Sequence, residues 1–357
     1  MLKGGGVKVA MKTLVIANPA AGNGKAGERW PRVRKAVYKL MPSHTAVMTE
    51  EPGHATDLAR QAVRDGFQRI LVYGGDGTVN EVVNGMFMGG KSLKKDVVLG
   101  IIPVAPGVGG DFCRSLGLNG KASQALDVIL DNRTETIDIG RVSYADEQGH
   151  ADERHFVNMA GMGLSNDVVC KVNKARRSKS LSASVAFKFS ALAGKLNHVS
   201  NMMRIEIDGY RPVYETACSI HICNGRFAGG GMMFSPDSEL NDGKLDLVMM
   251  RDFKAFHRMV ESKALYTGEH VKNPAVKHYR GKELKISSDG RANLEVDGEP
   301  VGMLPARFQV LEQSLKILCP PYFGRKSTDA EEKKMRKQLV AARNAANRSL
   351  NPRKMAG

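Results

Sequence analysis

Several common signatures of catalytic and metal sites are missing from this 357-residue sequence. The five cysteines form no C-x-x-C pair, and an odd number in so long a chain argues for reduced cysteines rather than a disulfide framework. The nine histidines show no H-E-x-x-H spacing, and neither a G-x-S-x-G elbow nor a G-x-x-x-x-G-K-[ST] P-loop occurs. Hydrolase chemistry is therefore unsupported, and the loop of the P-loop nucleotide-binding proteins is excluded.

Long apolar runs are also missing. No stretch approaches the ~20 apolar residues that a membrane-spanning helix needs, and the longest candidate, 181–196, is interrupted by Lys188 and Lys195. The Gly-rich start does not resemble a signal peptide, because the first apolar run, 14–17, reads as a strand. With reduced cysteines, these features predict a cytoplasmic protein that would meet a lipid only at the membrane surface.

Positive charge is what the sequence has in excess. The formal net charge is +16, which favours polyanions such as nucleic acid, anionic lipid or phosphorylated substrates. The segment 325–357 carries 10 Lys/Arg and 3 Asp/Glu, so it contributes +7. Aromatics make up 6% and no nucleic-acid motif appears, so no specific nucleic-acid partner is expected.

A second basic run lies just before the semi-apolar stretch 181–196. Five cations crowd into nine residues there: Lys171, Lys174, Arg176, Arg177 and Lys179. The ordinary interpretation is a solvated charged face. The alternative is a patch that docks on an anionic membrane, at ~1 kcal/mol per cation near the surface. On the second interpretation the protein associates with membranes peripherally.

Strand-like and helix-like segments alternate in the first third of the chain. Strands are predicted at 13–17, 44–49, 69–73 and 97–102, and helices at 24–40, 54–66 and 79–88. This alternation predicts an α/β domain with a parallel sheet and flanking helices, whose functional groups gather at the carboxyl ends of the strands. After about Asp138, period-two strands and Asp-Gly turns predict a mostly antiparallel, β-rich second domain. The expected division is a leader at 1–11, the α/β domain at 12–140, the β-rich domain at 141–324 and a basic tail at 325–357.

The most informative motif is Gly74-Gly75-Asp76-Gly77-Thr78, between a buried strand and a helix start. Glycines let the backbone approach a ligand closely, and a helix N-terminus favours an anion such as phosphate. An acid among the glycines would repel phosphate, so Asp76 is expected to hold a cation or to order a loop. The run from Asn18 to Lys25 follows the first strand with the same small residues, and so adds a second candidate phosphate loop.

The continuation Val79-Asn80-Glu81-Val82-Val83-Asn84-Gly85 makes the motif specific. Together with the Asn-Pro-containing first loop, it resembles the diacylglycerol kinase catalytic-domain family, which includes bacterial lipid kinases and sphingosine kinases. The resemblance extends over roughly 12–320. Further matching stretches are 106–112, which resembles a second nucleotide loop, then 227–231, 236 and 241–246, and finally the Asp-Gly-Glu element at 295–299.

This resemblance implies an α/β nucleotide domain packed on a β-rich domain, with the active site between them. It implies ATP as phosphoryl donor, Mg²⁺ as cofactor and a lipid as acceptor. The implied ATP contacts are Asn18, Thr49, Gly74, Gly75, Asp76, Gly77, Thr78 and Glu81, with Gly107 and Val108 in the second loop. Asp297, with Glu299 beside it, is the implied general base. A magnesium site is implied at the Asp242 carboxylate and the Glu239 and Lys244 carbonyls.

Phosphoryl transfer needs a divalent ion on the phosphates and a base for the incoming hydroxyl. On chemical grounds alone, Asp76 can serve the ion, directly or through water, and Asp297 can serve the hydroxyl. As turn acids, Asp297 and Asp242 also have a purely structural interpretation. The second loop departs from the family, since Val108 and Gly110 stand where Thr and Asn are usual. A lost hydroxyl would cost ~1–3 kcal/mol if its hydrogen bond were charge-assisted.

The sequence therefore predicts an ATP- and Mg²⁺-dependent lipid kinase, with two alternatives. One is a kinase for a soluble acceptor such as NAD, and the other is a non-catalytic lipid- or nucleotide-binding relative. The identity of the acceptor lipid and the oligomeric state are left open.

Overall fold

Four parallel strands form the sheet of the first part of the molecule. The computed structural model describes residues 11–104, 110–118, 120–164, 200–251, 253–261 and 263–324. All residues of the three strands β1, β3 and β6 are buried, as is usual for parallel strands covered on both faces. The strands are β1 (Thr13–Ala17), β2 (Thr45–Met48), β3 (Arg69–Gly74) and β6 (Val98–Pro103), in the order β6-β3-β1-β2. The predicted parallel sheet is confirmed.

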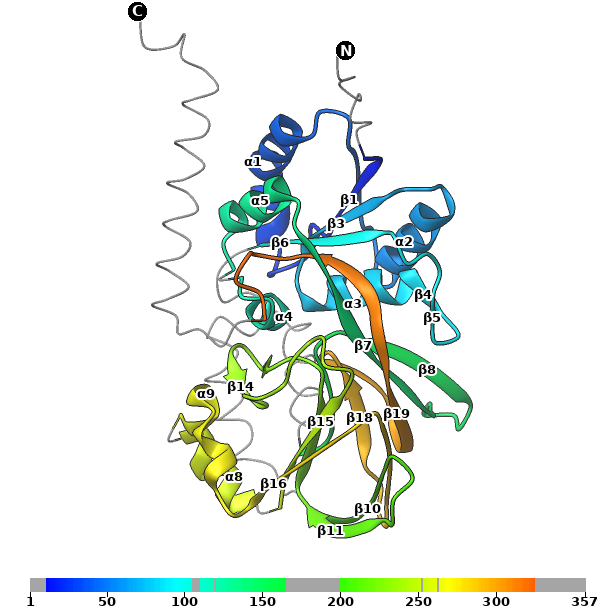
Figure 1. Cartoon of the computed structure of the whole chain (residues 1–357), viewed down its shortest axis with the longest axis vertical. Helices are drawn as coiled ribbons and strands as arrows, with labels where there is room; N and C mark the ends of the chain where they lie inside the picture. The colour runs from blue at the N-terminus through cyan, green and yellow to red at the C-terminus, as the bar shows by residue number, and fades with distance from the viewer. Residues whose placement is uncertain are drawn as a thin grey trace, which may run out of the picture.

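Amphipathic helices flank this sheet. They are α1 (Lys25–Leu40), α2 (His54–Arg64), α3 (Asp76–Met86), the short α4 (Asp111–Ser115) and α5 (Ala122–Asp131). Helix α1 lies beside α5, and α2 lies beside α3 (Figure 1). The buried face of α1 places Trp30 against Tyr73 of β3, with ring centroids 5.5 Å apart. The helices thus bury the sheet and leave the carboxyl ends of the strands for the site.

The helix after the glycines differs from its predicted range of 79–88 at both ends. It begins at Asp76, directly after the extended Gly75, and ends at Met86. Phe87 is already extended because Gly89 and Gly90, both with positive φ, form a tight turn. That turn pairs β4 (Phe87–Met88) with β5 (Lys91–Ser92) in a small antiparallel hairpin.

The second part is built from antiparallel strands, as the period-two pattern predicts. The strands up to the middle of this part are β7 (Thr134–Ala145), β8 (Ala151–Phe156), β9 (Met159–Gly163), β10 (Asn201–Ile207), β11 (Val213–Ala217), β12 (Ser219–Cys223), β13 (Phe227–Ala228), β14 (Met232–Met233) and β15 (Leu245–Met250). The later elements are α8 (Phe253–Glu261), α9 (Ala264–Thr267), the 3-10 helix η1 (Glu269–Lys272), β16 (Val276–Gly281), β17 (Glu283–Ser288), β18 (Asn293–Val296) and β19 (Glu299–Leu318).

The long strand β19 joins the two parts. It pairs antiparallel with β18, β17 and β7, and its last residues pair parallel with β6 through Lys316 and Ile317. In Figure 1, β19 and β7 run side by side from the lower, β-rich part up to the α/β part. One hydrophobic core lies around the parallel sheet and two others lie in the β-rich part. The shared strands fix how the two parts sit at the site.

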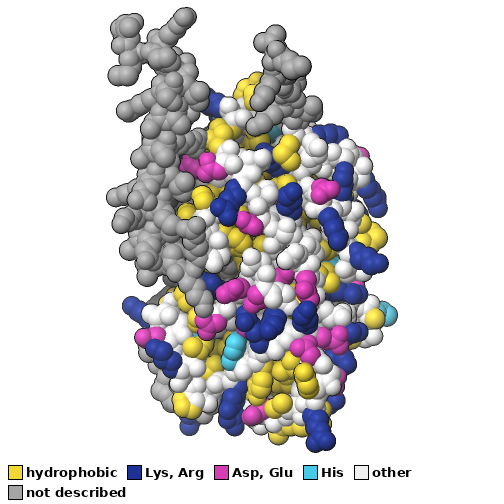
Figure 2. Space-filling model, in the orientation of Figure 1, with side chains coloured by type: hydrophobic (Ala, Val, Ile, Leu, Met, Phe, Trp, Pro, Cys, Tyr) yellow, Lys and Arg dark blue, Asp and Glu magenta, His cyan; other side chains and the backbone are white. Residues whose placement is uncertain are grey.

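The surface carries mixed charge. On the face in Figure 2, Lys and Arg side chains are spread over both parts, with Asp and Glu among them. The two basic runs, 171–179 and 325–357, lie outside the described residues, so the predicted membrane-docking patch stays a prediction. Within the part of the chain that the structure describes, no helix is long and apolar enough to cross a membrane.

Candidate active site between the two parts

The glycine turn, Gly74–Thr78, lies at the carboxyl end of β3, beside the end of β1. Asn18 follows β1, and its side-chain Nδ2 donates to the Thr78 hydroxyl oxygen over 3.0 Å. A side-chain carbon at Gly74 would lie 2.6 Å from that same hydroxyl oxygen, so the close approach requires glycine. The first N–H groups of α3 are left without helical partners there and point to where an anion would bind. The structure therefore brings the two predicted phosphate loops together.

Asp76 orders the start of α4. Its carboxylate accepts hydrogen bonds from the backbone N–H groups of Gly110 (2.6 Å), Asp111 (3.1 Å) and Phe112 (3.3 Å). Gly110 adopts φ +113, a conformation in which a side chain would be strained. These contacts correspond to the loop-ordering alternative for Asp76. Gly107 and Val108, the predicted contacts in the loop before α4, lie outside the described residues.

Thr49 and Glu81 lie further along the same edge of the sheet. Thr49 follows β2 and is buried, and its backbone N–H donates to the Ala17 carbonyl over 2.9 Å. The Glu81 carboxylate accepts the backbone N–H of Ala55 over 3.2 Å, at the start of α2. Glu81 therefore caps α2 from α3, and its predicted ATP contact stays a prediction.

Asp297 sits in the two-residue turn between β18 and β19. It has φ +47 and Gly298 has φ +86, the left-handed pair that tight hairpins use. Its carboxylate accepts four hydrogen bonds, from the backbone N–H groups of Val157 (3.0 Å), Asn158 (3.1 Å) and Met159 (3.0 Å) and from the Asn80 amide (2.8 Å). Burial raises the pKa of Asp297 to about 6, and the four donors oppose that rise.

Two glutamates flank Asp297. Glu299 is exposed, and its Oε1 lies 3.8 Å from the position that a side-chain carbon at Gly77 would occupy. Glu295 is buried, and burial raises its pKa to about 8, although its carboxyl group accepts the Gly298 N–H over 2.8 Å. These residues, Glu295–Glu299, form an acidic turn of the β-rich part, which therefore faces the glycine turn of the α/β part. Sequence reasoning gave Glu295 no role.

Asn80 and Asn84 connect α3 to β8, and sequence reasoning assigned neither of them a role. Both side-chain amides donate to the His155 carbonyl, over 2.9 and 3.0 Å. The side-chain oxygen of Asn84, Oδ1, accepts the backbone N–H of His155 over 2.9 Å. The side-chain oxygen of Asn80, Oδ1, accepts Arg154 Nε over 3.2 Å. The available signal was their i, i+4 spacing, which places both amides on one face of a buried helix.

The predicted magnesium ligands lie in the loop before β15. The Asp242 carboxylate accepts the backbone N–H of Lys244 over 3.1 Å, and its other oxygen pairs with the Arg280 guanidinium. In this arrangement the cationic guanidinium already compensates the carboxylate that a divalent ion would need, so the set does not fit Mg²⁺. Among the described residues, no group of three or more His, Cys, Asp or Glu side chains is arranged to hold a metal ion.

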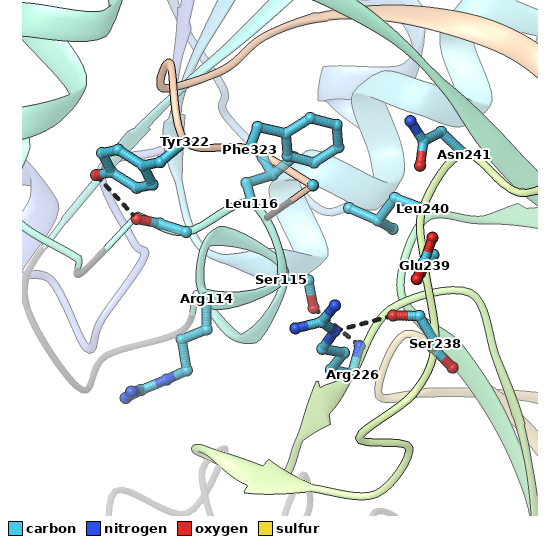
Figure 3. A pocket seen from close by; sticks show the side chains of 12 residues that line it. Arg114, Ser115, Leu116, Arg226, Ser238, Glu239, Leu240, Asn241, Tyr322 and Phe323 are labelled. Atoms are coloured by element: carbon cyan, nitrogen blue, oxygen red, sulfur yellow. Dashed lines mark hydrogen bonds between the residues drawn. The ribbon is translucent and has the colours of Figure 1, made fainter. Parts of the chain in front are cut away.

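Glu239 borders a small pocket at the junction of the two parts (Figure 3). On one wall, the Arg226 backbone N–H donates to the Ser115 hydroxyl over 3.1 Å, and Arg226 Nε donates to the Ser238 carbonyl over 2.9 Å (Figure 3). The pocket is lined by Arg114, Ser115, Leu116, Gly117, Arg226, Ser238, Glu239, Leu240, Asn241, Tyr322, Phe323 and Gly324. It is separate from the acidic turn, whose residues do not line it.

Comparison with known proteins gives the family. The diacylglycerol kinase catalytic domain matches residues 12–142, and the YegS C-terminal NAD kinase beta sandwich-like domain matches residues 158–319. A diacylglycerol kinase of Staphylococcus haemolyticus is 30% identical over 306 residues, covering 86% of this chain and 87% of the relative. The diacylglycerol kinase of Staphylococcus carnosus is 29% identical over 307 residues, covering 86% and 94%. The chain belongs to the diacylglycerol kinase family.

Solved structures show the same fold. A diacylglycerol kinase from Bacillus anthracis has a TM-score of 0.64 at 21% identity, covering 87% of this chain and 98% of that one. Another chain from the same organism reaches a TM-score of 0.72 at 24% identity, covering 90% and 100%. The predicted architecture, an α/β part with a parallel sheet and a β-rich antiparallel part, is thereby confirmed.

Proposed function

We propose that this protein is a lipid kinase that transfers the γ-phosphoryl group of ATP, bound with Mg²⁺, to the hydroxyl of a lipid. The single observation that carries the proposal is the approach of the acidic turn to the glycine turn, with Glu299 beside Gly77. A phosphate cradle and a candidate base must lie this close for phosphoryl transfer, which depends mainly on positioning and on charge stabilisation.

The glycine turn would hold the phosphates. The N-terminus of α3 supplies N–H groups, and Asn18 and Thr78 supply polar side chains beside them. Asp76 would act indirectly, because its carboxylate fixes the N–H groups of 110–112 in place. Mg²⁺ would arrive with ATP and neutralise charge on the phosphates.

The acidic turn would activate the acceptor. A carboxyl group with a pKa of about 6 is ionised at neutral pH and still basic enough to accept a proton, which suits a general base. The lipid hydroxyl oxygen would form a bond to the γ-phosphorus as the bond from that phosphorus to the β,γ-bridging oxygen breaks. The hydroxyl proton would pass to Asp297, and ADP would leave.

A lipid acceptor implies work at a membrane surface from the cytoplasmic side. The family relationship and the high positive charge of the whole sequence support this part of the proposal. Anionic lipid would attract the protein through that charge.

The test is transfer of labelled γ-phosphate from Mg-ATP to a panel of lipid alcohols in anionic micelles, with NAD as a soluble acceptor. Wild type is compared with Asp297→Asn and with Asp208→Asn. Asp208 is a matched control, because it has φ +49, precedes Gly209 in another tight turn and accepts two backbone N–H groups. Labelled lipid from wild type and Asp208→Asn, but not from Asp297→Asn, is expected. Labelled NAD without labelled lipid would overturn the proposal.

A further inference from the structure

The hydrogen-bonding capacity of the Asp297 carboxylate is full. Oδ1 accepts the N–H groups of Asn158 and Met159, and Oδ2 accepts the N–H of Val157 and the Asn80 amide. A carboxylate offers about four lone-pair sites. An acceptor hydroxyl can therefore hand its proton to Asp297 only if one of these four donors gives way.

Three of the four donors cannot easily move. The N–H groups of Val157, Asn158 and Met159 belong to the backbone that leads from β8 into β9, and β9 is paired on both sides, with β12 and with β18. The fourth donor, Nδ2 of Asn80, is on a side chain that reaches across from α3. Of the four donors, it alone could move away from Asp297 by a side-chain rotation, because the other three are backbone groups.

Asn80 has other partners that would hold it after such a shift. Its Nδ2 also donates to the His155 carbonyl over 2.9 Å. Its carbonyl oxygen accepts Nε and Nη2 of Arg154, over 3.2 and 3.1 Å. Losing the contact with Asp297 would therefore leave the Asn80 amide anchored to β8, with no buried polar group stranded.

We propose that Asn80 is a positioning residue that occupies, on Asp297 Oδ2, the place the acceptor hydroxyl takes during the reaction. This inference rests on the proposed function, in which Asp297 is the base. Before substrate binds, Asn80 keeps Asp297 in place and ionised. When substrate binds, the hydroxyl replaces the amide, and Asn80 stays on Arg154 and His155.

The charged groups around Asp297 make the hydrogen bond from Asn80 important for keeping Asp297 ionised. Glu295 on β18 and Glu299 on β19 are acidic neighbours in the same turn. On β8, Arg154 is held by Asn80, and burial lowers the pKa of His155 to about 4, so its ring is neutral near pH 7. The acids of α3 face elsewhere, because Asp76 binds 110–112 and Glu81 binds Ala55. No cation pairs directly with Asp297 among these groups.

The test compares Asn80→Ala, Asn80→Asp and Asn84→Ala across pH 5 to 9. Asn84 is the matched control, because it lies one turn further along α3 and bonds His155 and Asn80 but not Asp297. Two quantities are measured for each protein. One is kcat for lipid phosphorylation, and the other is the titration midpoint of the Asp297 carboxyl carbon, assigned by its loss in Asp297→Asn.

Removing a donor to the ionised form raises the proton affinity of a carboxyl group. In Asn80→Ala, the apparent pKa on the acidic side of the kcat–pH profile and the titration midpoint of Asp297 should both rise by about one pH unit. Activity should then return to within about threefold of wild type at pH 9. Asn80→Asp places a second carboxylate there and should shift both further. Asn84→Ala should leave both unshifted, whatever it does to thermal stability.

An equal loss of kcat at every pH in Asn80→Ala, with no shift of the midpoint, would overturn the inference. An equal shift in Asn84→Ala would do the same, because that variant keeps the Asn80 amide that donates to Asp297. If wild type phosphorylates no lipid, the proposed function fails. The Asp297 midpoints in the three variants then still decide whether Asn80 controls that carboxyl group.

Discussion

Asp76 and Asp297 are both aspartates beside glycine, Asp76 at the start of α3 and Asp297 in a tight hairpin turn, and both accept several backbone N–H groups. They differ in where those donors come from. The three donors to Asp76 all lie at the start of α4, within the α/β part. Asp297 takes three donors from its own β-rich part and a fourth from α3, on the other side of the junction.

This difference separates two ways in which a carboxylate can serve a site. Asp76 orders the start of α4, which on the proposed function belongs to the phosphate-binding surface, so its loss should weaken nucleotide binding and leave the acceptor side intact. Asp297 depends on how the two parts sit together, and its raised pKa makes it suited to proton transfer.

The largest effect is expected for Asp297→Asn. An amide is a far weaker base than a carboxylate, and its NH₂ group would face backbone donors. General-base catalysis is typically worth 10²–10⁴-fold, so we expect kcat for lipid phosphorylation to fall about 1,000-fold. The unpaired donors should also cost about 1–3 kcal/mol of stability. Both are measured by lipid kinase assay and by denaturant unfolding at pH 7.

Binding of Mg-ATP to Asp297→Asn is the internal control, because on the proposed function the α/β part holds the nucleotide. Unchanged affinity in calorimetry would show that the site is folded. Retention of more than a tenth of wild-type kcat would assign the proton transfer to another group, and Glu299→Gln would be tested next.

A smaller and different effect is expected for Asp76→Asn. The amide keeps one acceptor oxygen and replaces the other with a donor, so part of the grip on 110–112 is lost. A charge-assisted hydrogen bond of ~1.5–3 kcal/mol corresponds to roughly 10- to 100-fold, which should appear in KM for ATP. KM for the lipid should not change. A fall in kcat alone would place Asp76 in the chemistry and break the comparison.

Glu295 gives a pH-dependent prediction on the acidic turn. Its folded-state pKa of about 8 lies above the ordinary value of 4.5, so between these values the folded state binds the proton more tightly. Stability from this group is thus lost as pH rises from 4.5 to 8. In Glu295→Gln that loss disappears, and the variant should gain about 2 kcal/mol relative to wild type between pH 6 and pH 9.

Urea unfolding at pH 6 and pH 9 measures this effect. The control is Glu283→Gln, which removes a glutamate that forms an ion pair with Arg307 near the surface. A difference between wild type and Glu295→Gln that is the same at both pH values would show that Glu295 is not protonated in the folded protein.

Local sequence patterns predicted the structural features that are set by residues close together in the sequence. The parallel strands, the starts of α1 and α2 and the Asp-Gly turn at Asp297 follow from residue periodicity and from glycine, and they were predictable. The partners of the acids were not. Asn80 and Asp297 are separated by 217 residues, and Asp76 meets Gly110 across 34. No local pattern shows that two amides of α3 face β8, or that Glu295 is buried.

The smallest effect concerns Asp242, for which the family resemblance implies a magnesium site. It resembles the other two aspartates in accepting a nearby backbone N–H, but Arg280 pairs with its carboxylate. Because that guanidinium already compensates the charge, millimolar Mg²⁺ without nucleotide should raise Tm of wild type and of Asp242→Asn by the same amount, within about 1 °C. Thermal unfolding with and without EDTA measures this. A Mg²⁺-dependent rise of several degrees in wild type alone would mean that the ion displaces Arg280, and that Asp242 binds metal where Asp76 and Asp297 bind backbone.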